Sequence, residues 1–158
     1  FVLTDDLDDR SGDLGPHHVR SAIDYAVAAI EICGSRVENW DISFADTVAD
    51  NASTGAYVLG SQRRTLEEFD PRNAVMEMTI DDEVVSTGTG AACLGDPINA
   101  VVWLARQAAE LGEPLRAGQL ILSGALGPMR PITPGNQVRA VVEPLGAVAF
   151  TLGKEDQE

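Results

Sequence analysis

The chain has few basic residues. Its 158 residues include 11 Lys and Arg against 25 Asp and Glu, so the formal net charge at pH 7 is −14 and the sequence pI is about 4.3. Proteins that bind nucleic acids neutralise the phosphates with clustered Lys and Arg side chains, and here the basic residues are scattered. We therefore expect no nucleic-acid partner.

Long apolar runs and a dense cysteine pattern are also missing. No stretch approaches the roughly 20 apolar residues that span a bilayer, and no charged and then apolar leader precedes Phe1. The two cysteines, Cys33 and Cys93, lie in apolar surroundings, and nothing else suggests a disulfide-rich secreted domain. These absences predict a soluble cytoplasmic protein with reduced thiols and no membrane partner.

Several familiar catalytic signatures are absent as well. The sequence has no Gly-x-Ser-x-Gly, no His-Glu-x-x-His and no Cys-x-x-Cys, which argues against the familiar serine hydrolases and zinc enzymes. The stretch Thr87-Gly88-Thr89-Gly90 lacks the third glycine of a dinucleotide fingerprint, and no Gly-Lys-Ser/Thr follows it. We therefore set nucleotide binding aside.

The apolar content that is present suffices for one domain. Hydrophobic residues make up 44% of the chain, enough for a core that covers about two-thirds of the unfolded surface. Predicted strands outnumber predicted helices, and the helices occur singly between groups of strands. This order favours an α+β fold with a largely β core and a few flanking helices over a doubly wound sheet. Trp40 and Trp103 are expected in the core.

Proline, glycine and aspartate divide the chain into short elements. Two helices are predicted, each opened by a proline: an amphipathic one over 16–27, and a longer one that Asp96 caps and Gly112 ends. The clearest hairpin has the acidic turn Asp81-Asp82 between strands over 74–80 and 83–86. The other strands are predicted over 28–33, 56–59, 119–123, 137–143 and 147–152.

Glu31 is the first candidate for chemistry. It is the one charged residue in the otherwise apolar stretch 26–34, and burying a carboxylate is costly unless a cation or hydrogen bonds compensate. A divalent metal ion would compensate. Alternatively, strand alternation turns Glu31 to water while its two isoleucine neighbours face the core. The residues alone leave both interpretations open.

A second group of polar residues follows at Asp46, Asp50, Asn51 and Ser53. If this segment is helical, the two aspartates share a face and repel each other, a spacing that stability alone would not select. We therefore expect a catalytic use for them and a pocket that Glu31 shares with Asp50, Asn51 or Ser53. The alternative is that the aspartates cap helices and Asn51 forms a turn.

The loop Ser123-Gly124-Ala125-Leu126-Gly127-Pro128 follows a predicted strand. Its backbone amides and the Ser123 hydroxyl could bind a small anion such as a carboxylate. An ordinary turn is the alternative.

With these motifs in view, the chain resembles the 2-keto-4-pentenoate hydratase branch of the fumarylacetoacetate hydrolase superfamily over almost its whole length. Short motifs carry the resemblance: Ala29-Ile30-Glu31-Ile32, Ser35-Arg36, Asn39-Trp40-Asp41-Ile42, Asp46 to Ser53, Gly88 to Ala92, Leu94-Gly95, Ala100 to Ala105, Ser123 to Pro128 and Thr133-Pro134-Gly135. The resemblance implies a mixed β-roll or sandwich.

The resemblance also implies a metal. In that family a Glu-x-Glu pair, shortly before a Phe-Val-Leu strand end, joins a third acid to hold Mg²⁺ or Mn²⁺. The third acid matches Glu31, whereas the pair would lie immediately before Phe1. We therefore expect residues 1–152 to be a catalytic-type domain truncated at its N-terminus, followed by a polar tail over 153–158. This chain alone is then expected to be inactive.

The implied reaction is that of a lyase in the meta-cleavage catabolism of aromatic compounds, in which 2-hydroxypenta-2,4-dienoate is hydrated to 4-hydroxy-2-oxopentanoate. Asp46 or Asp50 would orient the water or relay protons. The substrate-binding residues would be Asn51, Ser53, Ser123 and Leu126. The implied partners are a small 2-oxo or 2-hydroxy-dienoate acid and further copies of the chain in a homo-oligomer.

Two other functions remain open. A related 2-oxo-3-enedioate decarboxylase of the 4-oxalocrotonate type resembles the hydratase but carries Lys residues where this chain has Asp41 and Ser43. A non-catalytic partner subunit, which lacks the Glu-x-Glu metal pair and serves assembly, is the alternative from another class.

Overall fold

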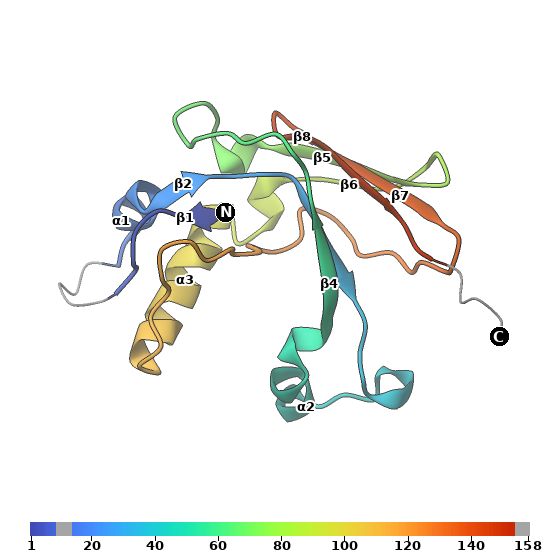
Figure 1. Cartoon of the computed structure of the whole chain (residues 1–158), viewed down its shortest axis with the longest axis horizontal. Helices are drawn as coiled ribbons and strands as arrows, with labels where there is room; N and C mark the ends of the chain where they lie inside the picture. The colour runs from blue at the N-terminus through green and yellow to red at the C-terminus, as the bar shows by residue number, and fades with distance from the viewer. Residues whose placement is uncertain (9–13, 154–158) are drawn as a thin grey trace.

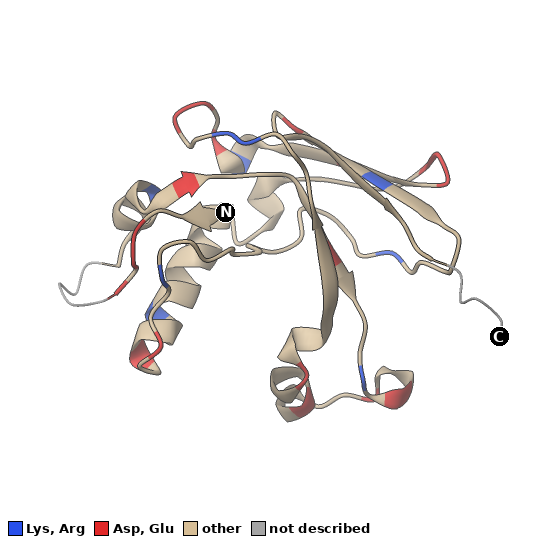
Figure 2. Cartoon of the chain, in the orientation of Figure 1, with Lys and Arg blue, Asp and Glu red and all other residues tan. Residues whose placement is uncertain are grey.

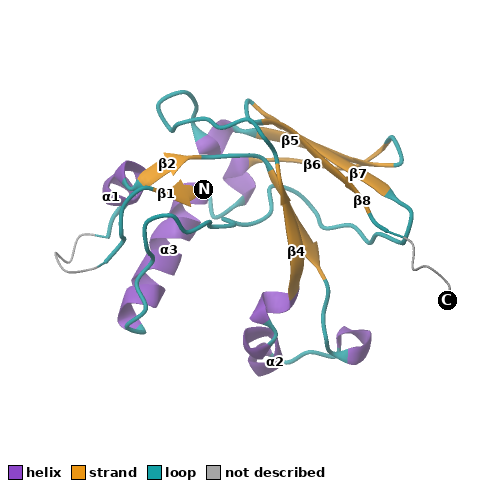
Figure 3. Ribbon diagram, in the orientation of Figure 1, coloured by secondary structure: helices purple, strands orange, loops and turns teal. Residues whose placement is uncertain are grey.

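The computed structural model describes residues 1–8 and 14–153 and confirms the predicted α+β fold with a largely β core (Figures 1 and 3). Nearly all of the tail predicted over 153–158 lies outside these residues. The described residues form three antiparallel sheets: a four-stranded sheet and two two-stranded ones. None of the described helices has the length and apolar character needed to cross a membrane.

The four-stranded sheet has the strand order β6, β5, β7, β8. Its strands are β5 (Val75–Ile80), β6 (Glu83–Thr89), β7 (Gln137–Glu143) and β8 (Gly146–Thr151). The predicted acidic hairpin is confirmed: Asp81 and Asp82 have φ angles of 50° and 67°, as the tight turns that join antiparallel strands require. The Asp81 carboxylate also accepts hydrogen bonds from the Gln137 amide and the Asn136 side chain, at 2.8 and 2.7 Å.

The first small sheet pairs β1 (Val2–Leu3) with β2 (Ile23–Tyr25), beside the helices α1 (Pro16–Ser21) and α3 (Pro97–Glu110). The predicted helix over 16–27 is therefore too long. It ends at Ser21 because Ile23 pairs with Leu3, and this tertiary pairing overrides the helical pattern. A buried cluster joins these elements: Leu3, Leu7, Val19, Ile23, Ile98, Val101 and Ala105.

The predicted strand over 119–123 is an extended segment without a strand of its own. Leu120 forms an isolated bridge to Val2, and the Ile121 amide donates to the Phe1 carbonyl at 2.8 Å. The segment pairs only with the chain start, where β1 is two residues long. A ladder of that length does not define a longer strand.

The second small sheet pairs β3 (Ala29–Cys33) with β4 (Thr54–Leu59). The connection between them contains η1 (Glu38–Trp40), α2 (Phe44–Ala49) and η2 (Asn51–Ser53). Together these elements form an arm, residues 29–59, that extends away from the rest of the molecule with α2 near its tip (Figure 1). The strand predicted over 28–33 is confirmed.

Helix α3 confirms its predicted signals. The Asp96 side chain accepts from the Ile98 amide at 2.9 Å, Pro97 is its first residue, and Gly112 follows it with a φ of 80°. The expected core positions of the tryptophans are wrong: Trp103 is 61% exposed and Trp40, in η1, is 48% exposed. Trp103 lies outside the buried stripe of α3, because Val101, Val102 and Ala105 take the inward positions.

Two single turns, η3 (Pro71–Asn73) and η4 (Gly90–Ala92), flank the sheet and complete the fold. Charges are distributed unevenly between the elements. Acidic residues gather at turns and helix ends, and the basic residues are scattered over helices, strands and loops (Figure 2).

Candidate active site

A cavity of about 620 Å³ opens where the base of the arm meets the four-stranded sheet and the segment 120–132. Its wall is largely apolar and includes Met76 and Ala140 from the sheet and Ile30 from the arm. Two charged residues, Glu31 and Arg130, line it among the residues that the structure describes. Apolar walls with a few polar groups are typical of small-molecule sites.

The loop over 123–128 is held tightly against the sheet. A Cβ on Gly88 of β6 would overlap the Leu126 carbonyl, and a Cβ on Gly127 would lie 2.7 Å from the Met76 methyl carbon. The buried Ser86 hydroxyl donates to the Pro128 carbonyl at 2.8 Å. These glycines therefore serve close packing, and the loop is fixed as one wall of the cavity.

Ser123 and Leu126, both predicted from the sequence, lie in this wall. The Ser123 carbonyl accepts a hydrogen bond from the Cys93 thiol at 2.9 Å. Cys33 and Cys93 are both free, as the sequence predicts. Burial, with a contribution from Glu31, raises the pKa of the Cys33 thiol. Burial, with a contribution from Asp96, raises the pKa of Cys93.

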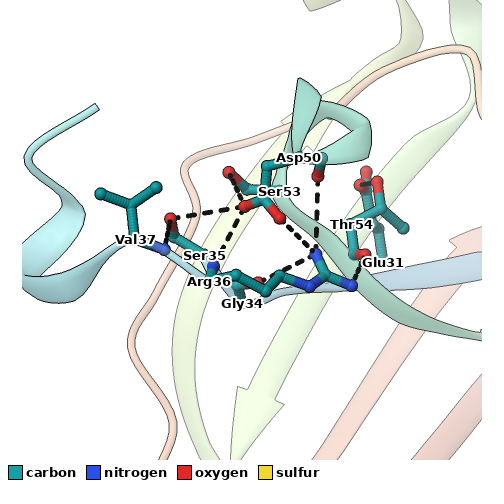
Figure 4. Close-up of polar contacts among 8 residues, drawn as sticks. All are labelled: Glu31, Gly34, Ser35, Arg36, Val37, Asp50, Ser53 and Thr54. Atoms are coloured by element: carbon teal, nitrogen blue, oxygen red, sulfur yellow. Dashed lines mark hydrogen bonds and ion pairs between the residues drawn. The ribbon is translucent and has the colours of Figure 1, made fainter. Parts of the chain in front are cut away.

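Glu31 is exposed, on the strand β3, and borders the cavity. The strand alternation considered from the sequence therefore holds, since Ile30 and Ile32 are the less exposed neighbours. Glu31 is not without a partner: the Thr54 hydroxyl donates to its Oε1 at 2.6 Å (Figure 4).

Asp46 lies in the first turn of α2 and caps it. The Ser43 amide donates to its Oδ2 at 2.9 Å and the Ser43 hydroxyl at 2.7 Å, while the Asp46 amide donates back to the hydroxyl at 3.3 Å. This is a reciprocal capping box. The hydrogen bonds from Ser43 hold the pKa of Asp46 below its usual value. The capping alternative is confirmed for this residue.

Asp50 links the two ends of the arm's connection (Figure 4). Its side chain is only 10% exposed and pairs with Arg36, with 3.3 Å between Oδ1 and Nη1. Its Oδ2 accepts from the Arg36 amide at 3.0 Å and from the Ser35 and Ser53 hydroxyls at 3.4 and 3.3 Å. The carboxylate therefore acts as a clamp between the end of β3 and the start of β4.

Asn51 and Ser53 belong to the turn that follows. Both have positive φ angles, 52° and 59°; Asn51 is exposed and Ser53 is buried. Neither they nor Asp50 line the cavity that Glu31 borders. The predicted pocket shared by Glu31 and these residues is therefore wrong, because the connection between the strands folds beyond the end of β3.

Three residues of this region were not predicted from the sequence. Arg36 donates from Nη2 to the Thr54 carbonyl at 2.9 Å, and Thr54 in turn binds Glu31. Arg130 donates from Nε to the Val85 carbonyl at 2.7 Å and lines the cavity. Arg36 stands three residues after the end of the predicted strand over 28–33 and belongs to the Ser35-Arg36 motif, a weak signal; nothing local marks Thr54 or Arg130.

The acidic residues that the structure describes do not by themselves build a complete metal site. No group of three His, Cys, Asp or Glu side chains in the described part of the chain lies close enough to hold an ion. Among the described acidic residues only Glu31 borders the cavity, and Cys33 lines it too. Mg²⁺ takes about six oxygen ligands, several of them water, so Glu31 fits as one ligand of such a site and not as the whole of it.

Comparison with known proteins gives consistent matches. Residues 4–152 match the family described as fumarylacetoacetate (FAA) hydrolase C-terminal. The chain is 53% identical over 150 residues to a 2-keto-4-pentenoate hydratase from Paraburkholderia xenovorans, covering 94% of this chain and 54% of the relative. A protein named TodF product hydratase, from Pseudomonas putida, is 52% identical over 155 residues, which is 98% of this chain and 57% of the relative.

A solved structure shares the fold closely. It is a 4-oxalocrotonate decarboxylase from Pseudomonas putida complexed with magnesium and adipate, with a TM-score of 0.88 and 35% identity, covering 95% of this chain and 56% of that one. The chain thus spans about half the length of the relatives that it matches.

Proposed function

Since the chain belongs to the fumarylacetoacetate hydrolase C-terminal family, we propose that it is the larger part of the catalytic unit of a hydratase for 2-hydroxypenta-2,4-dienoate. The observation that carries this proposal is the identity of more than 50% to relatives named as hydratases, over nearly the whole chain. The product would be 4-hydroxy-2-oxopentanoate, and the enzyme would be a lyase of aromatic catabolism.

The cavity suits such a substrate. Its apolar wall would hold the diene chain and keep bulk water away from it. Once C5 of the dienol is protonated, the 2-oxo-3-enoate carries an electrophilic C4, to which water adds its oxygen while C3 gains a proton. We assign binding of the substrate carboxylate to the fixed loop, through the Ser123 hydroxyl and the backbone at Leu126.

We propose Glu31 as one ligand of Mg²⁺ or Mn²⁺, with the remaining ligands supplied from beyond the described residues. The related decarboxylase complexed with magnesium supports this assignment. A bound divalent cation would polarise the C2 oxygen of a 2-oxo acid. The exposure of Glu31 beside the cavity, with one oxygen held by Thr54, leaves its other oxygen for this purpose.

The roles expected for Asp46 and Asp50 in handling water or protons stay predictions, as do those of Asn51 and Ser53 in binding the substrate. In this structure the two carboxylates are engaged in the capping box and in the clamp to Arg36. Neither carboxylate lines the cavity. A cytoplasmic location and a homo-oligomer remain proposals too.

A decarboxylase acting on a 2-oxo-3-enedioate is the second candidate. Arg130 in the cavity wall favours it, because a guanidinium could hold the second carboxylate of an enedioate. The lower identity to the decarboxylase, 35%, weighs against it. A non-catalytic partner subunit is the third possibility, since the described residues place a single acid at the cavity.

One assay separates the three. This chain, within a protein of the relatives' full length (called the active enzyme below), is mixed with Mg²⁺ and either the dienoate or the enedioate. The loss of the conjugated absorbance and the release of CO₂ are then followed. We expect hydration of the dienoate without CO₂. Release of CO₂ from the enedioate that is faster than hydration of the dienoate would support the decarboxylase. Inactivity on both substrates would support a partner subunit.

A further inference from the structure

We propose that Thr54 is a positioning residue that fixes the Glu31 carboxylate at the wall of the cavity, and that a β-bulge at Gly55 puts it there. This inference rests on the proposed role of Glu31 as a metal ligand. It concerns the arm, whose polar contacts are shown in Figure 4.

The bulge decides which face of the sheet Thr54 occupies. Glu31 pairs with Tyr57 and Ile32 with Ala56, but Cys33 pairs with Thr54, so Gly55 is the extra residue. Without it, Cys33 would oppose residue 55 and Thr54 would lie on the other face, because side chains alternate along a strand. The bulge thus brings the Thr54 hydroxyl to the face of Glu31.

Glycine suits the bulged position. A Cβ on Gly55 would lie 3.0 Å from the Ile32 carbonyl oxygen, which is closer than nearly all such contacts. The chain can therefore approach β3 closely at this point. A larger residue would push the strands apart at the place where Thr54 meets Glu31.

The contact itself is short and one-sided. The Thr54 hydroxyl lies 2.6 Å from Glu31 Oε1, the range of hydrogen bonds from a hydroxyl to a carboxylate. Oε2 receives no hydrogen bond from the residues that the structure describes. The carboxylate is thereby held by one oxygen, and the other oxygen is left for a cation.

The backbone of Thr54 is held in turn. Arg36 Nη2 donates to the Thr54 carbonyl at 2.9 Å, and Arg36 Nη1 pairs with the largely buried Asp50 at 3.3 Å. A second contact runs from Arg36 Nη1 to the Gly34 carbonyl at 3.2 Å. Arg36 therefore joins the end of β3 to the start of β4, which keeps the hydroxyl in register with Glu31.

A partner of this kind orients the ligand that it binds. Removal of such outer partners typically lowers metal affinity 10- to 100-fold. If the hydrogen bond has only a structural role, its removal would instead change neither the metal affinity nor the environment of the bound metal. These two outcomes can be measured separately.

The test compares Thr54→Val, Thr54→Ala and Thr54→Ser in the active enzyme. Mn²⁺ affinity is measured from the free-ion electron paramagnetic resonance signal, and the signal of the bound ion reports its environment. We expect about a 10-fold loss of Mn²⁺ affinity in Thr54→Val and Thr54→Ala, with retention within three-fold in Thr54→Ser. The matched control is Thr47→Val, whose hydroxyl donates to the Ser43 carbonyl elsewhere in the arm; its affinity should not change.

Unchanged affinity in both Thr54→Val and Thr54→Ala, together with a loss in Glu31→Gln, would overturn the positioning role and leave the proposed metal ligand intact. Unchanged affinity in Glu31→Gln would overturn both. If one of the Thr54 variants does not fold, the other and Thr54→Ser still decide the outcome.

Discussion

Gly88→Ala should loosen the wall of the cavity. The glycine lies in β6, where the loop over 123–128 crosses the sheet, and an added Cβ would overlap the Leu126 carbonyl and lie 3.1 Å from the Gly127 Cα. Both obstructing atoms belong to the backbone, so no side-chain rotation relieves the overlap. The loop must therefore move away from the strand, and the Ser86 hydrogen bond to the Pro128 carbonyl, 2.8 Å long, must stretch or break.

The expected loss of stability combines two terms. Overpacking of a well-packed site costs about 1–3 kcal/mol, and the loss of a hydrogen bond that satisfies a buried hydroxyl costs about 1 kcal/mol more. For a chain of 158 residues, each kcal/mol shifts the unfolding midpoint by about 2–4 °C. We therefore expect a Tm lower by roughly 4–16 °C.

Thermal unfolding followed by circular dichroism measures this shift. Gly34→Ala is the matched control, because a Cβ there meets nothing within 4 Å; its Tm should stay close to that of the unchanged protein. In the active enzyme, Gly88→Ala should also weaken substrate binding, because Leu126 belongs to the same loop. A Tm within 1 °C of the unchanged protein would refute the argument that the two backbones are in contact at Gly88.

Three further predictions concern the acidic groups. Glu31→Gln should abolish hydration in the active enzyme at saturating Mg²⁺ while Tm is kept, because the amide keeps the shape and loses the charge; activity within a few-fold would show that Glu31 is no ligand. In titration calorimetry the 158-residue chain alone should bind Mn²⁺ far more weakly than the active enzyme, since one carboxylate leaves most of the ion's hydration shell in place. Sub-millimolar affinity together with turnover would mean that the ligands are misplaced or come from another chain. The ionised Asp46 carboxylate should stabilise helix α2 fully above pH 3.8, the ordinary pKa of an aspartate, and this stabilisation should be lost as the pH falls through the lower pKa of the folded state. Amide NMR shifts of residues 43–49 followed against pH measure this loss. An equal pH response in Asp46→Asn would contradict the role of Asp46.

The local signals of the sequence translated directly into structure. The acidic turn Asp81-Asp82, the Asp96 cap and the Pro97 start of α3 all lie where the sequence predicted them. Each depends on interactions within four residues, so no distant part of the chain is needed to satisfy it. The same holds for Asp46, because its capping box with Ser43 lies within a few residues of the chain; capping was one of the two interpretations that the sequence left open.

Longer-range features escaped prediction for a physical reason. The helix over 16–27 was overestimated because a strand at the chain start captures Ile23. The expected pocket of Glu31 with Asp50 failed because the end of the connection that carries Asp50 does not line the cavity, and a pattern of spacing does not record that placement. Each outcome depends on pairing between segments that are distant in sequence.

The sequence by itself determined the α+β class and the family, because turn residues, alternation and short motifs are local properties of the chain. It left the position of Glu31 open between a metal-bound carboxylate and an exposed strand face. Only the tertiary structure decided that Glu31 is exposed and what it meets. A one-residue bulge at Gly55 changes the face on which Thr54 lies, and a shift of pairing register leaves no mark in composition or periodicity. The cavity wall depends on the same kind of information, since Gly88 and Leu126 come into contact only when the sheet and the loop have formed.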